Sequence, residues 1–67
     1  MYSNYVRLRD ERRLRDSDVA KGTGIGPFVF SDWKRGKSAP KVDKLQKIAA
    51  FFGVTLEELV NGSGTND

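Results

Sequence analysis

The sequence contains neither cysteine nor histidine. Disulfides, thiol chemistry and the usual zinc sites are therefore excluded, and we expect no bound metal and no cofactor. The chain also lacks a phosphate-cradling glycine loop and any pattern that pairs two buried acids. Without these groups it offers no candidate catalytic residue, so we expect that the protein is not an enzyme.

Long hydrophobic runs are absent as well. The longest apolar stretches are far shorter than the roughly 20 residues that cross a membrane. No basic segment followed by an apolar run marks a signal peptide. We therefore expect a cytoplasmic protein that makes no membrane contact.

A chain of 67 residues predicts one small domain. We expect this domain to cover residues 1–62 and residues 63–67, "SGTND", to form a disordered tail. A domain of this size is marginally stable. Since there are no disulfides, its stability must come from one compact apolar core.

The 12 basic and 9 acidic side chains are unevenly distributed along the chain. Residues 1–15 and 37–49 each carry a net charge of +3, residues 16–36 are balanced, and residues 50–67 carry −3. Such asymmetry suits a polyanion bound on one face. Ordinary solvated helix faces explain it equally well, so charge alone leaves both interpretations open.

The chain reads as short helices joined by tight turns. Near-alternating apolar runs are missing, which argues against strands, and we expect an all-α, compact five-helix domain. The expected helices cover residues 3–13, 16–23, 27 to just before 36, 42–52, and 55 to about 61. Ser3 is the expected N-cap of the first, and Pro27 suits the first position of the third. Gly24, Gly36 and Gly53 are expected to end helices.

Apolar residues at helical spacing predict the core. Its expected members are Tyr5, Leu8, Val19, Ala20, Ile25, Val29, Phe30, Trp33, Val42, Leu45, Ile48, Ala49 and Phe52. Trp33 shares a stripe with Phe30, so we interpret it as a core residue rather than a base-stacking platform. Thr55 and Glu58 predict a capping box at the start of the last helix.

The second and third helices, joined at Gly24, form a helix-turn-helix arrangement. The segment 14–36, "LRDSDVAKGTGIGPFVFSDWKRG", resembles the Cro/C1-type (XRE-like) helix-turn-helix family of phage and bacterial repressors. "YVRLRDERRL" is similar to that family's first helix, and "PKVDKLQKIAAFFGVTLEELV" to its last two. The resemblance implies a lambda-repressor-like domain that binds double-stranded DNA, usually as a homodimer on a near-palindromic operator, with no small-molecule ligand.

In that family the third helix lies in the major groove with its first residues against base edges. The matching residues are Gly26, Pro27, Phe28, Ser31 and Asp32. The family often has polar residues at the first few of these positions, and Gly-Pro-Phe departs from that pattern. No arginine stands there to read guanine, so specificity is modest or rests on DNA shape.

Each base-facing candidate has an alternative. Phe28 contacts thymine methyl groups, or it packs on a neighbouring helix or a protein. Pro27 touches methyl groups or only sets the geometry of the helix. Asp32 accepts from cytosine N4, or it is a solvated or locally paired acid. Ser31 can bond either kind of base.

The loop after the family's third helix meets the DNA backbone. This implies phosphate contacts by Arg35, Lys37, Ser38 and Lys41, with solvated surface charge as the alternative. Arg15 stands in the place of the usual N-cap residue, and can make a phosphate contact at the cost of a weaker cap.

Two further positions depart from the family. Asp16 stands where a glutamine often braces the third helix or contacts phosphate, and an acid suits phosphate only when a base pairs with it. Lys34 stands where a glutamate often pairs with an arginine that matches Arg9. Arg9 must therefore find Asp10, Glu11 or Asp32, or point to solvent.

Phe51 and Val60 are candidate dimer contacts, because the family's C-terminal region commonly supplies them, or they fill the gap to the last helix. The leading interpretation is a dimeric, sequence-specific transcriptional repressor located at the nucleoid. The alternative is a protein-interaction module that uses an apolar patch of Pro27, Phe28 and Val29.

Overall fold

The computed structural model describes residues 2–62, and the expected disordered tail lies outside them. Five helices follow one another along the chain: α1 (Tyr2–Glu11), α2 (Asp16–Thr23), α3 (Pro27–Lys34), α4 (Val42–Phe52) and α5 (Leu56–Asn61). The described residues contain no strand. The all-α, five-helix prediction is therefore confirmed.

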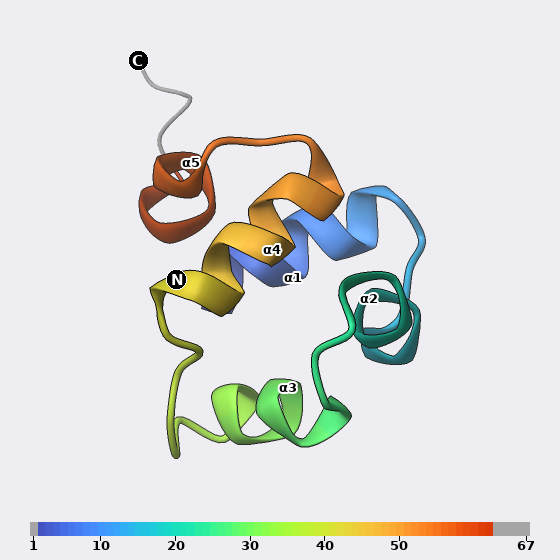
Figure 1. Cartoon of the computed structure of the whole chain (residues 1–67). Helices are drawn as coiled ribbons and strands as arrows, with labels where there is room; N and C mark the ends of the chain where they lie inside the picture. Colours follow the sequence, from blue (N-terminus) through green and yellow to red (C-terminus); the bar gives the residue numbers. More distant parts are fainter. Residues whose placement is uncertain (1, 63–67) are drawn as a thin grey trace.

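The buried residues form one core, and Figure 1 shows how the helices are arranged. α4 lies in front of α1 in this view, with α2 and α3 on one side and α5 on the opposite side. α2 packs on α3 and α4, while α5 packs on α1 and α4. α3 lies at the lower edge of the molecule in this view.

Tyr5 of α1 lies at the centre of the core and is fully buried. Its ring stacks on Phe30 at 5.4 Å and on Trp33 at 5.0 Å between centroids, and Phe52 lies at 6.0 Å. Such aromatic pairs stabilise beyond the area that they bury. They anchor α3 from behind, so Trp33 is confirmed as a core residue.

The first helix differs from the prediction at both ends. It begins at Tyr2, so Ser3 lies inside α1 and is not its N-cap. It ends at Glu11 because Arg13 adopts a left-handed conformation, with φ of 55°. The Arg13 amide then donates to Asp10 O at 3.0 Å and the Leu14 amide to Arg9 O at 3.0 Å. This pair of bonds is a Schellman motif, which closes the helix two residues early.

The expected core is correct apart from Val42, whose side chain is 58% exposed. Val42 is the first residue of α4. A helical side chain points toward the N-terminus of its helix, so this one extends beyond the packed body despite its correct spacing. Val29 is partly buried against the core.

The predicted ends of the other helices are confirmed. Gly24, Gly36 and Gly53 have φ of 76°, 73° and 73°, which is the left-handed region that glycine adopts freely. Thr55 and Glu58 form the capping box, since each side chain accepts from the other's backbone amide at 3.1 Å.

Among residues 2–62 there is no helix long and apolar enough to cross a membrane. The same residues hold no cluster of His, Cys, Asp and Glu that could bind a metal ion.

Candidate nucleic-acid interface

The turn between α2 and α3 sets the direction of α3. The Gly24 amide donates to Ala20 O at 2.9 Å and ends α2. The Thr23 hydroxyl donates to Val19 O at 2.7 Å and accepts from the Ile25 amide at 3.3 Å. Ala20 and Ile25 are buried on either side of this turn. Packing and local hydrogen bonds therefore hold the two helices in a fixed relation.

α3 has one buried face and one open face. Phe30 and Trp33 face the core. On the open side, Gly26, Pro27 and Phe28 are exposed, while Ser31 and Asp32 are partly exposed. All the residues expected to face DNA bases thus reach the surface, and Phe28 is 80% exposed. That exposure overturns the alternative in which Phe28 packs on a neighbouring helix of the domain.

Asp32 was expected to read a base or to be solvated or locally paired. Its carboxylate makes no hydrogen bond and no ion pair within residues 2–62. The structure therefore shows no local pairing of Asp32 within these residues. The carboxylate oxygens remain available as acceptors.

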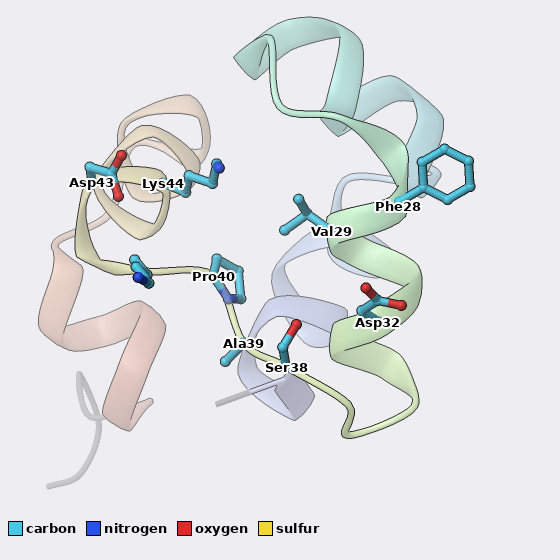
Figure 2. Close-up of a pocket in the computed structure, with 9 residues that line it drawn as sticks. Phe28, Val29, Asp32, Ser38, Ala39, Pro40, Asp43 and Lys44 are labelled. Atoms are coloured by element: carbon cyan, nitrogen blue, oxygen red, sulfur yellow. The ribbon is translucent and has the colours of Figure 1, made fainter.

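A groove of about 460 Å³ runs between α3 and the connector to α4 (Figure 2). α3, the connector and the start of α4 line it with Phe28, Val29, Asp32, Ser38, Ala39, Pro40, Lys41, Asp43 and Lys44. Figure 2 shows Val29 on the groove side of α3 and the Phe28 ring on the outer side. Lys44 was not predicted from the sequence as a site residue. It lies three residues after Lys41, at the start of the same helix, and this spacing could have indicated it.

The connector begins with a second Schellman motif. The Gly36 amide donates to Trp33 O at 3.0 Å and the Lys37 amide to Asp32 O at 2.9 Å. This turn leads the chain past the end of α3, and all four expected phosphate contacts beyond it are exposed: Arg35, Lys37, Ser38 and Lys41. Within residues 2–62 none of the three cations among them forms an ion pair.

Arg15, a further expected phosphate contact, is the N-cap residue of α2, and its side chain accepts no capping hydrogen bond. Asp18 compensates in part, because its carboxylate accepts from the Arg15 amide at 2.9 Å. The Arg15 guanidinium lies 3.9 Å from the same carboxylate and is 87% exposed. Such a loose surface pair contributes little stability, so it leaves the arginine free to meet another anion.

Asp16, a further expected phosphate contact, has the basic partner that such a contact needs, and the contact itself stays a prediction. Its carboxylate accepts from the Tyr5 hydroxyl at 2.6 Å and from the Arg9 guanidinium at 2.7 Å. Arg9 also donates to Asp10, at 2.9 and 3.1 Å. Asp10 was one of the partners expected for Arg9, and Asp16 was missed. We therefore interpret Asp16 as a brace between α1 and α2.

This brace changes the acidity of its partners. Burial, together with the hydrogen bond to Asp16, raises the pKa of Tyr5 well above its ordinary value. The hydrogen bond to Asp16 is also the main reason why the pKa of Arg9 is raised. Tyr5 is therefore a neutral donor, and Arg9 supplies the positive charge that faces the Asp16 carboxylate.

The two candidate dimer residues lie on different elements. Phe51 of α4 is 38% exposed, and its ring occupies the space where a Cβ at Gly22 of α2 would stand. It therefore fills a gap toward α2. Val60 is partly buried against the core, and its carbonyl accepts from the Asn4 side chain at 3.1 Å. A dimer role for either residue stays a prediction.

Comparison with known proteins places this geometry among transcription factors. A helix-turn-helix family model matches residues 7–59. The chain is 40% identical over 67 residues to the cryptic phage CTXphi transcriptional repressor RstR of Vibrio cholerae, covering 98% of this chain and 60% of that protein. It is 38% identical over 55 residues to the HTH-type transcriptional regulator DdrOP3 of Deinococcus deserti, covering 82% of this chain and 43% of that protein.

A third relative is the HTH-type transcriptional activator BcrR of Enterococcus faecalis, 33% identical over 55 residues, with 82% of this chain and 27% of that protein covered. The chain therefore spans less than two thirds of the length of each of these three relatives. The region that the family model matches contains α2, the turn and α3.

Proposed function

Because the chain belongs to the Cro/C1-type helix-turn-helix family of DNA-binding transcriptional regulators, we propose that it is a transcriptional repressor. In this proposal α3 enters the major groove of an operator and occupancy of the operator blocks access to a promoter. The protein acts in the cytoplasm, at the nucleoid. The similarity to a phage repressor over nearly the whole chain supports repression in particular.

One observation carries the proposal. The open face of α3 ends at a connector whose three cations, Arg35, Lys37 and Lys41, have no ion-pair partner within residues 2–62. Phosphate contacts from such cations orient a protein on the duplex. These cations lie beside the helix that would read the bases. One position of the protein on DNA therefore allows both the phosphate contacts and the base contacts.

We further propose that the repressor binds as a homodimer. A near-palindromic operator presents two half-sites about 34 Å apart, one turn of DNA, and a two-fold dimer places its two α3 helices in successive major grooves. Phe51 and Val60 remain the candidates for the symmetric contact.

Fluorescence anisotropy tests the proposal. A labelled duplex from the region that flanks the protein's own gene is compared with a scrambled duplex of equal length at two salt concentrations. We expect tighter binding to the native duplex and a marked loss of affinity at the higher salt, because released counterions drive the association. Equal weak binding to both duplexes, or none, would contradict the proposal.

The exposure of Phe28 favours a second candidate, a protein-interaction module on the same scaffold. Its apolar patch is smaller than the sequence indicated, because Val29 is partly buried and lies on the groove side of α3. Pro27 and Phe28 alone remain exposed. Under this alternative the anisotropy titration would show no preference for the native duplex.

A further inference from the structure

The open face of α3 carries an unusual set of chemical groups. A reading helix commonly uses arginine or lysine on guanine and asparagine or glutamine on adenine, and none of these stands among Gly26, Pro27, Phe28, Ser31 and Asp32. What stands there is one exposed aromatic ring, one carboxylate and one hydroxyl.

The carboxylate of Asp32 restricts the choice most. It only accepts hydrogen bonds when ionised, so it is repelled by the guanine N7 and O6 and by the thymine O4. Two donors remain in the major groove, the adenine N6 and cytosine N4 amino groups. The adenine amino group has acceptors on both sides, N7 of its own ring and O4 of the paired thymine. Cytosine N4 has an acceptor on one side only, so Asp32 favours cytosine.

The ring of Phe28 restricts the second position. It is 80% exposed and makes no hydrogen bond, so its recognition is limited to apolar groups. The thymine C5 methyl is the one apolar group that an unmodified base pair presents in the major groove. Contact with that methyl removes apolar surface of both partners from water, which is favourable.

The two residues act on neighbouring bases. They are four apart on α3 and so share a face of the helix. Four residues rise about 6 Å along a helix, and stacked bases of one strand are separated by about 3.4 Å. The two side chains therefore reach bases within about two steps of each other.

We propose that Phe28 and Asp32 form a single reading pair that selects a thymine methyl group and a nearby cytosine amino group in each half-site. This inference rests on the proposed DNA binding. Specificity then comes from the apolar contact of Phe28 and from the hydrogen-bond acceptor of Asp32. No side chain that reads guanine lies at the start of α3.

The test of Phe28 uses operators selected with the full chain from random-sequence duplexes. Each thymine of the selected site is replaced singly by deoxyuridine, which removes only the C5 methyl group. At one position per half-site we expect the wild type to bind about fourfold more weakly, the effect of one exposed methyl group. Phe28→Ala should bind both duplexes equally. The control Val42→Ala, which truncates another exposed apolar side chain, should keep the wild-type sensitivity.

The test of Asp32 repeats the selection with Asp32→Asn. Asparagine both donates and accepts, so we expect the preference for cytosine at one position to be lost. Glu57→Gln removes an exposed acid from α5, away from the groove, and should select the wild-type sequence. Far-ultraviolet circular dichroism of each variant confirms that the fold is intact.

The outcomes separate this inference from the proposed function. A wild type that is indifferent to deoxyuridine at every thymine overturns the role of Phe28. An unchanged cytosine preference in Asp32→Asn overturns the role of Asp32. Selection that enriches no sequence overturns both the reading pair and the proposed repressor, whereas an enriched operator that passes neither test overturns the reading pair alone.

Discussion

At the residue scale, Tyr5 and Asp16 join the core of the domain to its helix-turn-helix. Tyr5 stacks on the two aromatic rings of α3, Phe30 and Trp33, and donates its hydroxyl hydrogen to Asp16, the first residue of α2. One buried side chain therefore contacts both helices of the helix-turn-helix. Its hydrogen bond to a charged acceptor is of the stronger kind.

The raised pKa of Tyr5 predicts how stability depends on pH. In the unfolded chain a tyrosine ionises near pH 10, whereas in the folded protein Tyr5 remains neutral. The unfolded state then binds fewer protons, so above about pH 10 this group lowers the free energy of unfolding as pH rises, by up to about 1.4 kcal/mol per pH unit. At lower pH it has no such effect.

Urea unfolding of the wild type and of Tyr5→Phe between about pH 8 and pH 11 measures this dependence. Lysine titration is common to both proteins, so their difference isolates Tyr5. We expect the wild type to lose stability faster than Tyr5→Phe above about pH 10. Parallel curves would mean that the hydroxyl is not held neutral by the fold.

At the element scale, the end of α1 is unlike the ends of the four other helices. Arg13 occupies the left-handed position of a Schellman motif, while glycines with positive φ follow α2, α3, α4 and α5. A residue with a Cβ is less stable in that conformation by roughly 1 kcal/mol. This position is therefore a local weakness in an otherwise consistent set of helix ends.

We expect Arg13→Gly to raise the free energy of unfolding by about 0.5–1 kcal/mol, since glycine adopts this conformation without a steric penalty. Gly53→Ala is the matched control at another left-handed helix end, where φ is 73°, and it should lower stability by about 1 kcal/mol. Urea unfolding of the three proteins measures both changes. A loss of stability in Arg13→Gly would show that the arginine side chain contributes more than the backbone strain removes.

Helix positions were predictable from local sequence, and contacts between distant residues were not. Pro27, Gly24 and the Thr55–Glu58 box act on their own neighbours, so their spacing alone indicates where helices begin and end. Arg12, by contrast, donates to Phe52 O at 3.0 Å across 40 positions. The Tyr5–Asp16–Arg9 brace likewise joins two helices, and nothing in the local pattern of either helix indicates it.

In the candidate site, too, some features were predictable from the sequence and others were not. The exposure of Phe28 and of the connector cations followed from the faces of the helices and from the family resemblance. The bonds of Asp16 to α1 did not follow, because the resemblance implied a brace of the third helix or a phosphate contact at this position. The substitution of Lys34 for the usual acid was the only local sign that Arg9 had to find its partner elsewhere.

At the scale of the whole molecule, charged side chains are distributed unevenly between α5 and the connector after α3. The C-terminal end of the chain is acidic, and α5 carries Glu57 and Glu58 on the side of the domain opposite α3. The connector cations lie beside α3, so the proposed DNA-binding side carries unpaired cations and the α5 side carries acids. Such a distribution orients the domain during encounter with a duplex.

The central claim is that α3 and the connector after it form the DNA-binding face. The most direct measurement is the slope of log binding constant against log salt concentration for the operator, in the wild type and in Arg35→Gln, Lys37→Gln and Lys41→Gln. Each lost phosphate contact should reduce the magnitude of the slope by about 0.9. Arg7→Gln is the control, because Arg7 lies on α1 and pairs with Glu11, and it should leave the slope unchanged. Equal slopes in all five proteins would contradict the assignment of this face.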